Sequence, residues 1–484
     1  MATQTPVEPR QTSVEPRLTS RLDVPILLPI SVVVLVVALA FGGALYVLAA
    51  AALIPILWAI VKRPQRGVLL LAALVPLNGL FLIFPVPGSS GWKETLTGAL
   101  LVLTFFVPSD RRPPAGRRLP GWLPAAGLYV AVGVVSAVTV WGSQALVGLK
   151  IDFFYMLLAI VIWRAPLSRR ERDQLVTIFM VVGFITAVFG IFQQIVGHAT
   201  LNSWGYEYNS VIRFTSGMRL RSFSTFNQPF PFAFYLMIVI LLGLPFALSD
   251  LKRWRNRLFL AALPIYGLGL LFSYVRGAWL GLGIGLCYLA FHRYKWLLLG
   301  VPLALVALLF LPGGSLSNAA FQSGSFTART NLWSDRVNQI VSHPFGGGIA
   351  STGAAASKVA DAAHQSNALL VQPDNSYLKT GFELGLPGLW MQVLLLIALL
   401  LWSRKVERHV RGDDARFVMS FTAQMLGIIV AATVSTYFEI FPMDVMFWLM
   451  IGIVATIDAG TEPEEDEAAA EPRTLAPALR PRFP

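Results

Sequence analysis

Asp374, Asn375 and Tyr377 stand close together where the longest polar segment of the chain ends and an apolar run begins. A carboxylate can accept the proton of an attacking hydroxyl, and an amide and a phenol can orient a polar substrate. Asp374 also follows a proline, where it would suit a helix N-cap. The sequence therefore predicts half of an active site at this junction, with Asp374 as a general base or, alternatively, as a structural cap.

Arginines in three other polar segments supply the other half of the predicted site. A guanidinium binds phosphate bidentately and stays charged, so converging arginines would form a clamp for a diphosphate. The alternative is a structural role, in which each arginine extends to lipid headgroups or pairs with a carboxylate. Arg276 suits that alternative least, because it adjoins two apolar runs. The arginines are Arg213, Arg219 and Arg221, then Arg276, then Arg329 and Arg336; we expect Arg221 and Arg276 to contact the diphosphate, with Arg219 and Arg329 close by.

Two histidines on the larger polar segment, His343 and His364, are alternative bases or substrate ligands, although a lone loop histidine is more often only solvated. Glu383 follows Lys379 by one helical turn, so we expect a structural ion pair between them. The sequence shows no phosphate-binding glycine loop, no nucleophile elbow and no metal-ligand cluster. We therefore expect neither a metal nor another cofactor.

The composition indicates a polytopic membrane protein of the all-α class. Of the 484 residues, 55% are apolar and only 13% are charged, against about one quarter in a typical soluble domain. The formal net charge of +12 comes from lysines and arginines in short loops, which indicates membrane orientation rather than nucleic-acid binding. The single cysteine, Cys287, lies in an apolar run and is expected to be a small core residue.

Six short basic loops separate the apolar runs and mark the predicted cytoplasmic side. Each interval between consecutive basic loops has room for two spans of about 20 residues. This predicts a bundle of about twelve to fourteen transmembrane helices, the lower number applying if one tight pair is re-entrant. The predicted spans are about 26–41, 44–61, 67–84, 92–107, 121–140, 147–163, 174–196, 230–249, 258–274, 276–291, 296–312, 386–403, 417–437 and 440–458.

The predicted transmembrane domain, 26–460, lies between a disordered cytoplasmic segment, 1–25, and a disordered acidic tail, 461–484. Two long segments, 197–229 and 312–385, are predicted on the outer side, and the larger should contain short helices. Apolar residues recur at helical spacing in Asn331–Ser342, which predicts an amphipathic helix on the membrane surface.

Four segments, in order and spacing over roughly residues 180–400, resemble the O-antigen ligase / O-antigen polymerase (Wzy-like) family. Asp374 stands where the ligase pattern has its functional histidine, so a carboxylate would take the role of base. Ser224 stands where glycine is usual. The segments are Arg221–Pro229, Ser273–Leu280, Arg329–Trp333 with His343–Gly348, and Asp374–Leu378 with Glu383–Gly385.

The resemblance implies a metal-independent glycosyltransferase of the bacterial inner membrane, acting on its periplasmic or extracytoplasmic face. Its donor would be a glycan on a polyprenyl diphosphate such as undecaprenyl diphosphate, and its acceptor a glycan or glycolipid. Asp374 favours a surface-polysaccharide polymerase, with an O-antigen ligase for lipopolysaccharide as the alternative. An anion or solute transporter and a non-catalytic export scaffold are the rivals from other classes. The expected partners are the bilayer and other polysaccharide export proteins, and no nucleic acid.

Overall fold

The computed structural model describes residues 45–83, 91–107, 119–206, 220–299, 323–362 and 374–460. The described chain is helical, which confirms the all-α prediction, and it divides into two compact units, Met1–Arg66 and Gly67–Pro484. The first unit contains α2 (Leu45–Lys62), where Lys62 lies over the ring of Trp58. The predicted termini, 1–25 and 461–484, and the predicted span at 26–41 lie outside the described residues.

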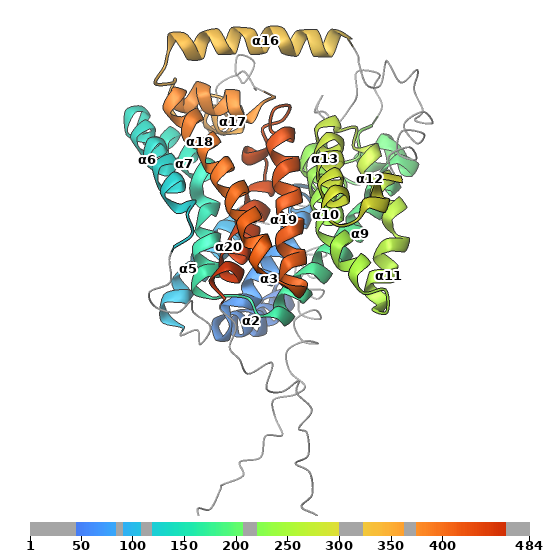
Figure 1. The fold of residues 1–484 in the computed structure, drawn as a ribbon. Coiled ribbons are helices and arrows are strands. Elements are labelled where there is room, and N and C mark those ends of the chain that lie inside the picture. Colours follow the sequence, from blue (N-terminus) through green and yellow to red (C-terminus); the bar gives the residue numbers. More distant parts are fainter. Residues whose placement is uncertain are drawn as a thin grey trace, which may run out of the picture. The chain divides into compact units, whose positions relative to one another are not determined.

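The second unit carries the remaining helices, which Figure 1 shows in sequence colours. Its first half comprises α3 (Pro64–Leu74, which begins in the first unit), η1 (Val75–Leu77), α4 (Leu80–Ile83), α5 (Trp92–Phe106), α6 (Leu123–Val140), α7 (Gly142–Phe153), η3 (Phe154–Met156), α8 (Leu157–Arg164) and α9 (Arg169–Ser203). Its second half comprises α10 (Pro229–Ser249), α11 (Trp254–Ala261), α12 (Leu263–Phe272), α13 (Arg276–His292), η5 (Lys295–Leu299), α16 (Ser323–Ser342), α17 (Gly353–Ala362), α18 (Ser376–His409), α19 (Gly412–Ala431), η7 (Tyr437–Glu439) and α20 (Met443–Ala459).

Six helical segments among the described residues are long and apolar enough to cross a membrane, which confirms a polytopic helical protein. Part of the predicted count of twelve to fourteen falls on residues outside the description, including 300–312. The six are Leu123–Val140, Gly142–Arg164, Arg169–Ser203, Pro229–Ser249, Ser376–His409 and Gly412–Ala431.

Two of the longest helices are interrupted at glycines, close to where the predicted spans end or begin. The backbone of Gly197 within α9 has φ +76°, and that of Gly385 within α18 has φ +69°. These left-handed conformations are open to glycine but strained for other residues. The predicted spans 174–196 and 386–403 therefore end and begin at real breaks in the helices.

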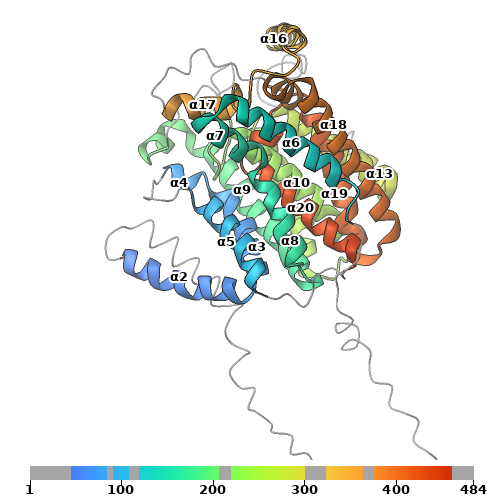
Figure 2. The same ribbon diagram turned by 90° about the vertical axis from the view of Figure 1, so that its left-hand side faces the viewer.

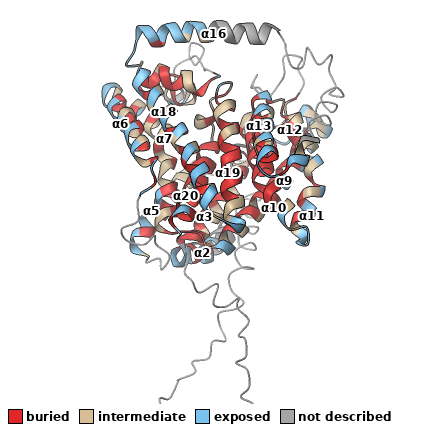
Figure 3. Ribbon diagram, in the orientation of Figure 1, coloured by how far each residue is buried: buried red, intermediate tan, exposed pale blue. Residues whose placement is uncertain are grey.

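The core of the second unit is built around α10, which is buried on all sides (Figure 3). Helices α9, α12, α13 and α19 pack against it, which explains why its sequence is apolar all round. On the other side of the unit α6 packs on α18 and α7, while α8 packs on α20. Helix α13 lays Gly281 and Gly285 against α19, so that the two backbones approach closely.

Three of the basic loops meet at one end of this unit. Arg172 Nη2 lies 2.7 Å from Asp414 Oδ1, and Arg255 Nη1 lies 2.9 Å from Asp173 Oδ1. These ion pairs join the loop before α9 to the loop before α19 and to the start of α11. Three of the six basic loops that were predicted to share one side of the membrane therefore lie together.

Two predictions about single elements have different outcomes. Residues 331–342 are helical and form the second half of α16, which lies across the end of the unit (Figure 1, and end-on in Figure 2). Its place on a membrane surface stays a prediction. Cys287 was predicted to be a core residue, and this is wrong: it lies exposed on α13, because that helix buries its glycine face instead.

Candidate active site

The arginine segments at 221 and 276 come together in the structure. Ser222 donates its backbone N–H to the carbonyl of Phe272 at 2.8 Å, and Arg221 donates from Nε to the carbonyl of Ser273 at 3.1 Å. The guanidinium of Arg221 also lies 4.9 Å from the centroid of the Phe230 ring. Arg276 follows Ser273 by three residues and stands exposed as the first residue of α13. Arg221 is therefore held against the turn that carries Arg276.

The backbone around Ser224 is held by a single glutamine of α9. The Gln193 side chain accepts from the amides of Phe223 and Ser224 at 3.0 and 2.7 Å and donates to the Ser224 carbonyl. Ser224 has φ +52°, in the left-handed region that favours glycine. Its hydroxyl donates to the carbonyl of Thr186 at 2.6 Å. Glycine, the residue of the resembled pattern, would adopt this backbone conformation without strain, whereas serine adds the hydrogen bond to Thr186.

The turn after α19 lies between the arginines and the start of α18. A side chain at Gly277 would meet Val434, so the first turn of α13 packs closely on this turn. From the other direction, Ser376 donates its backbone N–H to Ala432 and Ser435 carbonyls at 2.9 and 3.1 Å. The predicted segments at 221, 276 and 374–377 are thus linked through one short turn.

The N-cap of α18 is Asn375 rather than Asp374, so the alternative reading of Asp374 as a cap is wrong. Asn375 Oδ1 accepts from the amides of Tyr377 and Leu378 at 2.9 and 3.1 Å, and Asn375 is buried. The Tyr377 hydroxyl donates to the carbonyl of Ile429 at 2.8 Å. Asn375 and Tyr377, predicted to bind substrate, therefore both have structural contacts, whereas Asp374 is exposed beside them.

A buried ionic network follows one turn later in α18. Lys379 Nζ lies 2.6 Å from Asp152 Oδ1 and 2.9 Å from Glu383 Oε2. Lys379 is 5% exposed and Glu383 is fully buried. The predicted pair of Lys379 and Glu383 is confirmed, whereas no pattern in the sequence indicated that Asp152 of α7 lies beside them.

The same network holds the N-terminus of α17. Glu383 Oε1 accepts from the amide of Thr352 at 3.2 Å, and Glu439 Oε1 accepts from the amide of Ala355 at 3.0 Å. Burial raises the pKa of Glu439, and Lys379 opposes that shift. We name the set Asp152, Lys379, Glu383 and Glu439 the buried ion network. In the sequence, these charges could be recognised only because each adjoins an apolar run.

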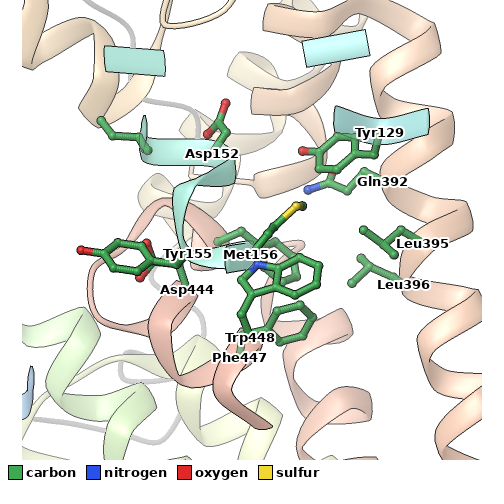
Figure 4. Close-up of a pocket in the computed structure, with 12 residues that line it drawn as sticks. Tyr129, Asp152, Tyr155, Met156, Gln392, Leu395, Leu396, Asp444, Phe447 and Trp448 are labelled. Atoms are coloured by element: carbon green, nitrogen blue, oxygen red, sulfur yellow. The ribbon is translucent and has the colours of Figure 1, made fainter. Parts of the chain in front are cut away.

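A small pocket borders this network between α6, η3, α18 and α20 (Figure 4). Asp152, Tyr129 and Gln392 line it together with Asp444 and apolar side chains. Its volume of about 30 Å³ has room for water and none for a sugar. The pocket beside the buried ion network therefore cannot hold a sugar, and the network is a structural centre.

The segment His343–Gly348 docks on the break in α18. Gly347 and Gly348 donate backbone N–H groups to the carbonyls of Phe382 and Glu383 at 2.8 and 3.0 Å. A side chain at Gly346 would stand 2.4 Å from the Glu383 carbonyl oxygen, which explains the glycine. His343 itself is exposed. Arg219 and His364 lie outside the described residues, as does the side chain of Arg329.

The α12–α13 turn, His343–Gly348 and the start of α18 all lie in one stretch of the chain that resembles a known family. Residues 258–393 match the family model of O-antigen ligase. The resemblance is therefore confirmed over this segment, which includes Arg276, the docked segment and Asp374. Arg221 lies outside the match and reaches the segment through its hydrogen bond to Ser273. No match was found among curated proteins.

Metal ligation is not indicated by the side chains that the structure describes. Among these residues, no group of three histidine, cysteine, aspartate or glutamate side chains could hold a metal ion. Within the described part of the chain, Arg221 and Arg276 supply positive charge at the candidate site.

Proposed function

We propose that this protein is a membrane glycosyltransferase that moves a glycan from a polyprenyl diphosphate to a sugar hydroxyl, as a surface-polysaccharide polymerase. The observation that carries the proposal is the hydrogen bond from Arg221 Nε to the carbonyl of Ser273, which holds one guanidinium beside the turn that bears Arg276. The O-antigen ligase match over this turn supports the reaction class.

The proposed reaction is a displacement at the anomeric carbon of the donor glycan. The acceptor hydroxyl oxygen forms the new bond to this carbon, and the bond from the carbon to the diphosphate oxygen breaks. The diphosphate leaves with the bonding electrons, and Arg221 and Arg276 stabilise its growing negative charge. Because the guanidinium groups supply this stabilisation, we propose that the reaction requires no metal ion.

Asp374 is the proposed base, which takes the proton of the acceptor hydroxyl. It is exposed, and its neighbour Asn375 already caps α18, so the Asp374 carboxylate is not needed for the helix. Arg219 and Arg329 are proposed as further diphosphate ligands, and His343 and His364 as further substrate ligands or as substitute bases.

The site is proposed to face the periplasmic or extracytoplasmic side of a bacterial inner membrane. The support is the gathering of basic loops at one end of the bundle, through Arg172 and Arg255, since such loops favour the cytoplasm. At the candidate site, Ser376 donates a hydrogen bond to the turn after α19, and Ser222 donates one to the end of α12. Neither of these acceptor segments belongs to a basic loop.

An O-antigen ligase is the second candidate, because the matching family model carries that description. The two activities share the donor and differ in the acceptor. A polymerase joins one lipid-linked glycan to another and gives a ladder of products, whereas a ligase makes a single transfer to a glycolipid such as lipid A core.

The test is transfer by the purified full-length protein in proteoliposomes that contain a lipid-linked oligosaccharide. We expect a ladder from the wild type, and a loss of about 10²- to 10³-fold in rate for Arg221→Lys and for Arg276→Lys, since lysine cannot make the bidentate contact. The matched control is Arg257→Lys, an exposed arginine of α11, which should retain the full rate.

Different products separate the candidates. A single product with a glycolipid acceptor would favour the ligase, and movement of the substrate across the membrane without a new glycosidic bond would favour a transporter. Near-normal rates in both Arg221→Lys and Arg276→Lys would remove the diphosphate clamp.

A further inference from the structure

An apolar groove lies on the other side of the second unit from the arginines. It has a volume of about 810 Å³ and is formed by α6, α7, η3, α8 and α20. It lies between two packed pairs, α6 on α18 and α8 on α20. Helices α6 and α7 face the viewer in Figure 2. Its walls are almost wholly apolar and include Gly127, Val130, Phe153, Leu157, Trp163 and Ala455.

Three lysines gather at one end of this groove. Lys150 lines it directly, and its Nζ lies 2.8 Å from Glu94 Oε1 with half of the side chain exposed. Lys93 Nζ lies 3.7 Å from the same oxygen, and Lys93 is within electrostatic range of Lys150 and of Lys358 on α17. The carboxylates near Lys93 are Glu94 and Asp444.

The position of the lysines fixes the direction of the groove. Lys358 belongs to α17, whose N-terminus is held by Glu383 and Glu439 beside the start of α18. The other end of the groove is lined by Trp163, near the C-terminal end of α8, and by Ala455, near the C-terminal end of α20. The charged end is therefore the end that the proposed function assigns to the outer side, where lipid headgroups lie.

We infer that this groove binds a polyprenyl diphosphate, with its chain along the apolar walls and its diphosphate at Lys93, Lys150 and Lys358. The apolar walls suit a long hydrocarbon chain, and three lysines near one end suit an anionic headgroup such as a diphosphate.

This molecule is a second lipid rather than the donor at the arginines. Arg221 and Arg276 are positioned by the α12–α13 turn and the turn after α19, whereas the groove is built from α6, α7, α8 and α20. A polymerase needs two lipid-linked substrates, and this assignment of the groove to the acceptor lipid rests on the proposed function.

The groove can be filled without disturbing the helices around it. A side chain built at Gly127 meets no heavy atom within 4 Å, and the same holds for Gly283 on α13, outside the groove. Both glycines are exposed. Gly127→Trp therefore fills the groove, and Gly283→Trp is its matched control.

The first measurement is photo-crosslinking of the full-length protein in nanodiscs to a polyprenyl diphosphate that carries a diazirine in its chain. We expect labelled peptides from α6, α8 and α20 in the wild type and in Gly283→Trp. Labelling should fall by at least about tenfold in Gly127→Trp, the factor that 1.4 kcal/mol of lost binding gives. Equal labelling in both variants would overturn the assignment of the chain.

The second measurement concerns the headgroup. Unlabelled polyprenyl diphosphate should reduce labelling of the groove more strongly than uncharged polyprenol does. In Lys150→Gln, the two competitors should differ less in the concentration needed to reduce labelling. If phosphatidylglycerol competes as well as polyprenyl diphosphate, the groove holds an ordinary membrane lipid and the inference is wrong.

The third measurement separates the two lipids. Arg221→Lys and Arg276→Lys should leave labelling of the groove unchanged, and a loss in these variants would show that one donor molecule occupies both places. Crosslinking requires no turnover. Labelling without glycan transfer by the wild type would therefore contradict the proposed function and leave the groove as a binding site for this lipid.

Discussion

The two charged regions of this protein are built in opposite ways. At the candidate site, Arg276 is exposed and Arg221 is held through a backbone carbonyl, so the site consists of cations presented by turns. In the buried ion network, Lys379 is enclosed and pairs with Glu383 of its own helix and with Asp152 of α7. Enclosed charges here therefore join helices of the fold, whereas the arginines of the candidate site are positioned by backbone groups and lie nearer the surface.

The largest expected effect comes from breaking the buried ion network. Lys379→Met removes the cation that faces Asp152 and Glu383, and stranding buried carboxylates in this way costs about 3–5 kcal/mol. We expect loss of most monodisperse protein after extraction into detergent. Lys252→Met, at an exposed lysine, is the control. Equal thermal unfolding of the two variants would mean that the network does not stabilise the fold.

A smaller effect, confined to activity, is expected at Asp374. Asp374→Asn should lower glycan transfer by about 10²- to 10⁴-fold, the usual contribution of a positioned base, with an unchanged unfolding temperature. Asn375→Ala should instead lower stability by about 1 kcal/mol, since it removes the cap of α18. Full transfer by Asp374→Asn would move the role of base to His343 or His364.

The smallest effect tests how the backbone presents Arg221. Ser224→Ala keeps a Cβ at φ +52° and loses the hydrogen bond to Thr186, which should cost about 1 kcal/mol. Ser224→Gly loses the same bond but relieves about 1 kcal/mol of left-handed strain, so it should unfold near the wild-type temperature. The reverse order in thermal unfolding would show that backbone conformation does not determine the residue here.

Much of the fold followed from the sequence because a membrane span is a local property of about 20 residues. The breaks at Gly197 and Gly385 fell close to predicted ends for the same reason. The contact of Lys379 with Glu383 was predictable because both lie on one helical face. Cys287 was misplaced because an apolar run does not reveal which of its faces meets lipid.

The parts that the sequence could not show depend on long-range contacts. Asp152 meets Lys379 across more than two hundred residues, and no local pattern relates them. The alternative role of Asp374 as a cap was one position too early, because Asp374 and Asn375 are both good caps and no local pattern separates them. The hydrogen bond from Arg221 to Ser273 spans 52 residues, so the expectation that the arginines converge could not say which contact holds Arg221.

Glu383 and Glu439 accept hydrogen bonds at the N-terminus of α17, which also limits where other anions can bind. The amide groups at the start of a helix are a common binding place for phosphate. Here the amides of Thr352 and Ala355 are already bonded to carboxylates of the same chain. These carboxylates thus occupy a position that could otherwise bind the diphosphate. We therefore expect free phosphate not to bind at the N-terminus of α17.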